Sequence, residues 1–262
     1  MEHTANFLAL VPLLCAVLFL GMLLAIEAGR RLGRRRLIAD PEGARAGAGA
    51  VEGAVFALLG LLIAFTFSGA ASRFDARRQL VAEEVNDIGT AWLRIDVLPA
   101  EAQPPLRDLF RQYLDARLAT YRKLPDLDAS QAEQARATAL QKQIWTEAVA
   151  AAGASGSSPP PMLLLPALNT MFDIATTRLM AAQMHPPLVV FAMLALLVLA
   201  GAMLIGHGMA SGRTRNWLHG AGFAAVMAVT VYVILDIEYP RFGLIRVDAI
   251  DQSLVDLRRS MD

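Results

Sequence analysis

The chain has little charge and almost no cysteine. Only 18% of its residues are charged, and the acidic and basic side chains cancel to a net charge of zero. Proteins that bind nucleic acid carry a basic surface, so this balance gives no reason to expect nucleic acid as a partner. The single cysteine, Cys15, can form no intramolecular disulfide. We expect it to pack as a small residue within an apolar run.

Signatures of metal binding and catalysis are also missing from the sequence. No cysteine or histidine spacing matches a structural metal site, and the sequence has no nucleophile elbow, phosphate loop or zinc-helix pattern. The acids Asp248, Asp251 and Asp256 near the end of the chain do not have the spacing of a calcium loop. We therefore expect no enzyme activity, no catalytic residues, no cofactor and no metal.

What the chain has instead is apolar sequence in long runs. Hydrophobic residues make up 55% of it, and period-two strand patterns are absent. Each of four runs has about the 20 residues that a helix needs to cross a bilayer. The first run is longer than the roughly 15 residues of a signal-peptide core, so we expect a membrane span there. The sequence predicts an all-α integral membrane protein with four transmembrane helices at 7–27, 51–72, 187–206 and 217–237.

The second apolar run passes into charged sequence without a helix break. No proline occurs after residue 51 until Pro99, so nothing local stops the helix before residue 98. Beyond the apolar run, hydrophobic residues recur at alternating four- and three-residue steps, which is the pattern of a single helical seam. One helix is therefore predicted to cross the membrane and to continue into a soluble bundle through Val81, Val85, Ile88, Trp92 and Ile95.

The segment 73–186, between the second and third runs, is predicted to be largely helical. Its first helix is Leu106–Leu124, and one side of that helix is made of Leu106, Phe110, Tyr113, Leu114, Arg117 and Tyr121. A second helix follows a cap at Asp128 or Ser130, and a third covers Leu163–Met184.

Two further stretches complete the organisation of the chain. GASGSSPPP, at 153–161, is typical of a linker, and residues 238–262 form a C-terminal tail. Because the segment 73–186 begins and ends on membrane helices, we expect it to pack as a helical extramembrane bundle. We therefore predict a single domain over residues 1–262.

The arginine distribution bears on orientation. Six arginines follow the first apolar run and two lie between the third and fourth, which places these connectors in the cytoplasm by the positive-inside rule. The helical segment 73–186 would then lie outside. Arginines near the other membrane ends oppose this interpretation: Arg73, Arg77, Arg78, Arg178, Arg241 and Arg246.

Two stretches make the chain resemble the bestrophin superfamily, in particular the bacterial bestrophin-like membrane proteins. Bacterial bestrophins have an apolar second helix that leads into phenylalanine, small residues, an arginine–aromatic pair and an Ala-Arg pair. The matching stretch here is Phe65–Arg78, with Arg73-Phe74 and Ala76-Arg77-Arg78. The end of the fourth run, LDIEYPRFGLIRVDAIDQSL, is similar in Asp236, Glu238, Pro240, Phe242, Gly243 and Asp248.

The resemblance implies an oligomeric ion channel. Bestrophins are pentamers with a cytosolic helical segment and a pore lined by the second helix. By this resemblance the chain would form a homo-oligomer, a pentamer, in the bacterial inner membrane and would pass small monovalent ions. The pore constriction would lie at Ala57, Leu61 and Phe65, where an apolar ring gates by dewetting. The pore mouth would lie at Arg73, Arg77 and Arg78, whose positive potential attracts anions.

Several alternatives stay open at this point. The stripe Ala57, Leu61 and Phe65 fits contact with lipid or with a helix core as well as a pore. Arg78 can simply pair with Asp75, and Asp236 and Glu238 can bind Arg241 or Arg246. The second function hypothesis is a non-conducting membrane scaffold or sensor. Its helical segment would bind a partner protein through the charged face of the helices at 107–123 and 130–147.

Overall fold

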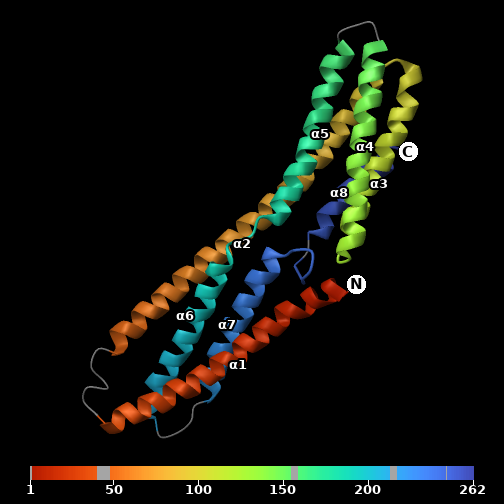
Figure 1. Cartoon of the computed structure of the whole chain (residues 1–262). Helices are drawn as coiled ribbons and strands as arrows, with labels where there is room; N and C mark the ends of the chain where they lie inside the picture. The colour runs from red at the N-terminus through yellow and green to blue at the C-terminus, as the bar shows by residue number, and fades with distance from the viewer. Residues whose placement is uncertain (1, 40–47, 155–158, 213–216, 246) are drawn as a thin grey trace. The chain divides into compact units, whose positions relative to one another are not determined.

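In the computed structural model, helices make up both parts of the protein (Figure 1). The structure describes all residues apart from 1, 40–47, 155–158, 213–216 and 246. Within these described residues there is no strand, which confirms the all-α prediction. The α-helices are α1 Glu2–Ala39, α2 Ala48–Leu93, α3 Gln103–Arg122, α4 Leu127–Ala154, α5 Pro159–Gln183, α6 Leu188–Gly208, α7 Trp217–Glu238 and α8 Asp248–Ser260.

Helix α2 is continuous from the apolar run into the charged sequence, as predicted. Its α-helical part ends at Leu93 and passes into the 3₁₀ turn η1, Arg94–Val97. The backbone becomes extended at Leu98, with ψ near 159°. Pro99 explains this ending, because a proline disfavours the α conformation in the residue before it.

The start of α4 differs from the prediction. The residue that caps it is Asp126, whose Oδ1 accepts a hydrogen bond of 3.0 Å from the backbone N–H of Ala129. The Ser130 hydroxyl instead donates to the carbonyl oxygen of Thr120 on α3, at 2.7 Å. The predicted caps Asp128 and Ser130 are therefore wrong, because the helix begins earlier, at Leu127.

The C-terminal region is more ordered than the predicted tail. Residues from Asp248 to Ser260 form α8, and Leu254 on it is fully buried. The predicted linker at 153–161 is only partly described: its first two residues end α4, its last three begin α5, and 155–158 lie outside the described residues.

The chain divides into two compact units. One is extramembrane in composition and consists of Met1–Ala5, Arg73–Met184 and Pro240–Asp262; the other holds the apolar runs and consists of Asn6–Ser72 and His185–Tyr239. Four helical segments of the described residues are long and apolar enough to cross a membrane, by length and composition: Leu10–Ala39, Gly49–Val97, Met162–Ser211 and Trp217–Glu238.

The extramembrane unit has one hydrophobic core. The predicted seam of α2 lies in it: Val81, Ile88, Trp92 and Ile95 are buried, and Val85 is partly buried against them. The predicted apolar side of α3 faces the same core, where Phe110 and Tyr113 have no exposed surface. Side chains from α4, α5 and α8 complete the core: Ile144, Leu168, Met171 and Leu254.

The membrane unit depends on glycines where α1 crosses α6. A Cβ built on Gly206 would lie 1.9 Å from the carbonyl oxygen of Ile26, and one on Gly29 would lie 1.9 Å from that of Met203. Only a residue without a side chain lets the two backbones approach this closely. Helix α7 joins the crossing through Gly220, whose Cβ position lies 3.3 Å from the Ile26 side chain.

Candidate functional site: the exposed face of α2

Helix α2 buries one face and exposes the opposite one along its length. Residues advance by about 100° along a helix, so positions three, four and seven apart share a face. The residues Leu59, Thr66, Ala70, Val81, Glu84 and Ile88 are buried and fall on one side. The exposed residues Ala57, Leu61, Phe65, Ser68, Ser72, Asp75, Gln79, Asn86 and Thr90 fall on the other.

The predicted constriction residues lie on the exposed face. Leu61 is 52% exposed and Phe65 67% exposed, and Ala57 is exposed on the same side. Described residues of the chain leave at least half of the Leu61 and Phe65 surfaces uncovered. Exposure alone does not select a pore, because other membrane helices also expose large apolar side chains, such as Leu24 on α1 and Val229 on α7.

The buried face of α2 packs within the membrane unit. The Phe56 ring stands edge-on to the Phe223 ring of α7, with 6.2 Å between centroids. The position of a Cβ on Gly201 of α6 lies 3.1 Å from Phe56 and 3.6 Å from Leu59. The Thr66 hydroxyl donates to the carbonyl oxygen of Leu62 one turn earlier, at 2.6 Å. The contacts with α6 and α7 fix the rotation of the helix and so decide which residues stay uncovered.

The three predicted mouth arginines have different surroundings. Arg77 donates to the backbone carbonyl oxygens of Ala181 at 3.1 Å and Met184 at 2.9 Å. Arg77 therefore satisfies carbonyl oxygens at the C-terminal end of α5. Its positive charge also interacts favourably with the negative end of the α5 dipole. Arg78 pairs with Asp75 at 3.5 Å, as one alternative expected, and both are exposed. Arg73 is half-buried and has a contact of its own.

A buried cluster of charges lies in the extramembrane unit beyond this point of α2. Glu84 has no exposed surface, and its carboxylate receives hydrogen bonds from two guanidinium groups. Arg117 of α3 donates from Nε at 2.6 Å, and Arg178 of α5 donates to the other oxygen. Burial by itself raises the pKa of Glu84, but the two arginines outweigh it and hold that pKa below the ordinary carboxyl value. The carboxylate is thus kept charged in the core.

Two more charges extend this cluster towards the C-terminal region. Arg241 binds Asp251 of α8 through two contacts, at 2.7 and 3.2 Å. Asp251 also lies 3.8 Å from Arg178, which links the two halves of the cluster. The guanidinium groups of Arg178 and Arg241 lie over the Tyr121 ring, 4.4 and 4.3 Å from its centroid. The cluster therefore ties α2, α3, α5 and α8 together.

Sequence reasoning finds only part of this cluster. The helical pattern puts Arg117 on the apolar side of its helix, and a charge on such a side needs a buried partner. That requirement is the signal that could have pointed to a carboxylate on the seam of α2. Asp251, one of the acids weighed for calcium, pairs with arginine. Among the described residues, no group of three or more histidines, cysteines or acids could hold a metal ion.

The acids at the end of α7 are buried within the membrane unit. Asp236 is 5% exposed and Glu238 fully buried. A partner of Glu238 is His185, whose Nδ1 lies 3.0 Å from the carboxylate and whose ring stacks on Tyr239 at 4.4 Å. Arg241, one of the arginines expected here, binds Asp251, and Asp236, Glu238 and Arg241 each have further contacts. The other expected arginine, at 246, lies outside the described residues.

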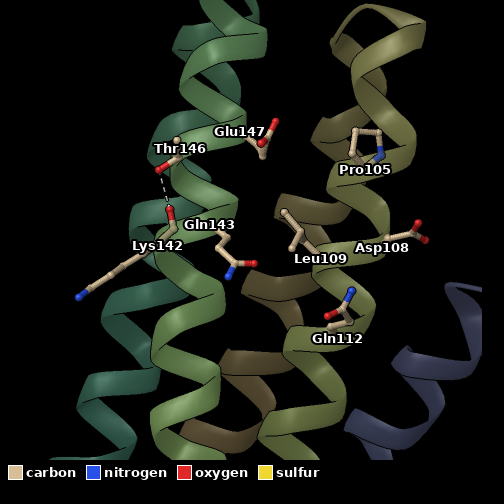
Figure 2. A pocket seen from close by; sticks show the side chains of 8 residues that line it. All are labelled: Pro105, Asp108, Leu109, Gln112, Lys142, Gln143, Thr146 and Glu147. Atoms are coloured by element: carbon tan, nitrogen blue, oxygen red, sulfur yellow. Dashed lines mark hydrogen bonds between the residues drawn. The ribbon is translucent and has the colours of Figure 1, made fainter.

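The charged face expected to bind a partner protein contains a groove. It lies between α3 and α4, has a volume of about 570 Å³, and is lined by Pro105, Asp108, Leu109, Gln112, Lys142, Gln143, Thr146 and Glu147. Figure 2 shows these side chains on the two neighbouring helices, with the Thr146 hydroxyl donating to the carbonyl oxygen of Lys142 at 2.9 Å. Most of the lining residues are polar or charged, but their apolar atoms also contribute to the surface, and no cluster of catalytic groups converges on it.

The fold and the exposed helix face define an all-α, multi-span membrane protein with a helical extramembrane bundle. A family model described as a bestrophin-like domain matches residues 14–250, which is most of the chain. The chain therefore belongs to the bestrophin-like family, as the resemblance had indicated. This family is known for channels rather than enzymes.

A solved structure supports the fold. The chain is similar to a bacterial bestrophin homologue from Klebsiella pneumoniae, crystallised as a point mutant, at a TM-score of 0.60 and 14% sequence identity. The match covers 91% of this chain and 99% of the other. At this identity the likeness concerns the fold alone. A search of curated proteins finds no match.

Proposed function

We propose that the protein is an oligomeric ion channel of the bestrophin type, in which small monovalent ions pass through a pore lined by α2. The observation that carries this proposal is the uncovered face of α2. In a membrane protein of a channel family, a helix face that its own chain leaves open is available to line a pore on a symmetry axis. The constriction would lie at Ala57, Leu61 and Phe65.

The chemistry along this face supports a conducting path. It begins with apolar side chains at Ala57, Leu61 and Phe65, and continues with the small polar residues Ser68 and Ser72. Beyond the apolar run the same face is polar and charged, at Asp75, Gln79, Asn86 and Thr90. A short apolar ring followed by polar surface provides a hydrophobic gate with a wet exit. Because residues from Arg73 onward belong to the extramembrane unit, the part of this pattern that favours a pore over lipid contact is Ser68 and Ser72, which are polar within the membrane unit.

The glycines of α2 support assembly around this helix. Gly49, Gly53 and Gly60 have nothing within 4 Å of their Cβ positions, unlike the glycines where α1 crosses α6. Gly53 and Gly60 lie near the exposed stripe, so they are free to pack against α2 of another copy. We propose that the chain forms a homopentamer around its second helices, and that its two units act as one bestrophin-like domain.

At the pore mouth we assign different roles to the three arginines. The Arg77 guanidinium is engaged by α5 carbonyls, so it would hold the exit of α2 in place. Arg78 is exposed next to Asp75 and Arg73 is half-buried, so these two would set the charge that a passing ion meets.

We further propose the bacterial inner membrane as the location, with the helical segment in the cytoplasm as in bestrophins. This orientation opposes the arginine count at the two short connectors. The extramembrane unit has polar and charged residues on its surface, so its composition is consistent with a location on either side of the membrane.

The test is conductance of the purified oligomer in a planar bilayer. Leu61→Ala and Phe65→Ala should each widen the constriction and raise the single-channel current, because a smaller apolar ring wets more easily. Leu24→Ala is the matched control, since Leu24 is a well-exposed leucine on α1 and faces no pore in this proposal. It should leave the current unchanged.

Two outcomes would contradict the proposal. An intact oligomer that carries no current in the wild type and in either α2 variant is not a channel. A current that responds to Leu24→Ala as strongly as to Leu61→Ala would place the pore away from α2. The first outcome would favour the scaffold hypothesis, for which the groove between α3 and α4 offers a partner a mixed polar and apolar surface.

A further inference from the structure

Helix α1 carries a buried arginine where its apolar run ends. Arg30 is only 8% exposed, while Arg31, Arg34, Arg35 and Arg36 around it are exposed. It lies four residues past Ile26, which is about 6 Å along the helix. The predicted span 7–27 ends just before Arg30, so we expect Arg30 to lie near the level of the lipid headgroups. A guanidinium group buried there is costly unless an anion neutralises it.

The described part of the chain provides no such anion. The Arg30 Nε is buried and has no hydrogen-bond partner among the described residues. Among the described carboxylates of the membrane unit, Glu27 binds Arg31 at 2.9 Å, and Glu52 lies next to Gly208 on α6. The other two, at 236 and 238, are at the opposite end of α7. No ion pair joins Arg30 to any of these described carboxylates, although Glu27 has a further contact besides Arg31.

Arg30 lies beside the close crossing of α1 and α6. Gly29, immediately before it, lies against the Met203 backbone, so no side chain fits between the two helices there. One turn further on, the Cβ position of Gly33 is 3.2 Å from His207 Nδ1. That nitrogen is a second buried polar atom without a hydrogen-bond partner in the described part of the chain. Two unsatisfied groups thus belong to the same crossing.

We propose that Arg30 and His207 form a binding site for the phosphate of an anionic phospholipid headgroup. A guanidinium group offers Nε and Nη as a planar fork that matches two phosphate oxygens. The exposed arginines that follow Arg30 add positive potential for an anionic lipid. Exposed apolar side chains of the same unit, such as Leu20 on α1 and Leu218 on α7, provide a surface for the acyl chains. The site needs no ion conduction and goes beyond the proposed channel function.

A free phosphate ion has the same oxygen chemistry, but the site favours a lipid. Arg30 is 8% exposed and lies next to the apolar run, so an anion in bulk water approaches it poorly. A phospholipid delivers its phosphate at this depth from within the bilayer. Inorganic phosphate is therefore the second arm of the test.

The experiment measures lipid binding to the purified full-length oligomer by native mass spectrometry. Phosphatidylglycerol, phosphatidylcholine and inorganic phosphate are added separately to the wild type, to Arg30→Gln and to Arg36→Gln. Arg36→Gln is the matched control, because it removes the same charge from an exposed arginine of the same helix. We expect the wild type and Arg36→Gln to retain phosphatidylglycerol and Arg30→Gln to bind it at least about tenfold more weakly, which is the usual effect of losing a charged hydrogen bond.

Each other outcome would overturn the proposal. Equal weakening by Arg30→Gln and Arg36→Gln would mean a general charge effect. Equal retention of phosphatidylcholine would mean that the headgroup is not recognised, and displacement of the lipid by inorganic phosphate would mean a free-anion site. If Arg30→Gln does not assemble, Arg30→Lys keeps the charge but loses the fork. If Arg30→Lys bound phosphatidylglycerol as tightly as the wild type does, this would contradict the role of the guanidinium group.

Discussion

Replacing Glu84 by glutamine should destabilise the extramembrane unit strongly. The variant removes the carboxylate that separates the guanidinium groups of Arg117 and Arg178, which are 5% and 6% exposed. Removing one partner of a buried ion pair costs about 3–5 kcal/mol, because the remaining charge stays buried without compensation. Arg178 keeps Asp251 at 3.8 Å and the Tyr121 ring, so we expect a loss at the lower end, about 3 kcal/mol.

The assay is thermal unfolding of the full-length protein in detergent. A loss of about 3 kcal/mol lowers the melting temperature by roughly 6–12 °C, at about 2–4 °C per kcal/mol for a protein of this size. The control is Glu83→Gln, which makes the same chemical change at the exposed neighbouring position. It should melt within about 2 °C of the wild type.

A double variant separates the charge effect from packing. Glu84→Met combined with Arg117→Met removes both partners and fills their space with apolar atoms. It should melt above Glu84→Gln, because an apolar replacement of a buried pair is far less costly than an orphaned charge. Equal melting of Glu84→Gln and Glu83→Gln would refute the reasoning, since the buried carboxylate would then contribute nothing.

The same residue predicts a pH dependence with a definite sign. The folded pKa of Glu84 lies below its unfolded value, so the stabilisation is fully present above the unfolded pKa of about 4.3. It is lost as the pH falls through the folded value. The wild type should therefore lose stability below about pH 4, and Glu84→Gln should lack this part of the acid limb. An identical acid limb in both proteins would show that other groups carry it.

Three further predictions follow from other parts of the molecule. Burial raises the pKa of Tyr113 to about 12, so the stabilisation from the neutral phenol is complete below about pH 10 and is lost as the pH rises towards 12. Tyr113→Phe should therefore remove the phenolate absorbance change at about 295 nm that occurs at the highest pH, and an unchanged titration would contradict this. Gly206→Ala should lower the stability measured by thermal unfolding by about 1–3 kcal/mol or more, because its Cβ would overlap the Ile26 carbonyl oxygen. The control Gly222→Ala, whose Cβ position has nothing within 4 Å, should be neutral or slightly stabilising. Equal effects of the two variants would mean that α1 and α6 separate easily. Lys142→Cys, exposed on α4, should resist an impermeant thiol reagent in intact cells and react after lysis; labelling in intact cells would place the helical segment outside.

Local patterns in the sequence were enough to predict the helices before the C-terminal tail, and short motifs indicated the family; α8 was not predicted. The seam Val81, Ile88 and Ile95 and the apolar side of α3 follow from helical periodicity, which acts over one or two turns and needs no knowledge of the partner helix. The four spans follow from length and hydropathy for the same reason. The residues at the exit of α2 carried the resemblance that the family match confirmed. The prediction was wrong at the start of α4, where Asp126 caps the helix in place of Asp128 or Ser130, because neighbouring polar residues compete for one capping position.

Partner choice was beyond the sequence, because it depends on which distant segments pack together. Glu84 meets Arg117 and Arg178 across 33 and 94 positions, and nothing near Glu84 identifies either one. The uncovered face of α2 has the same origin: Leu61 and Phe65 were predictable as one stripe, but the stripe is open only because other helices cover the opposite face. The sequence alone determined the membrane spans, most of the helices and their apolar faces through local periodicity, but not α8. Only the tertiary structure decided which charges meet in the core and which face of α2 stays open, because both depend on contacts between segments far apart in the chain.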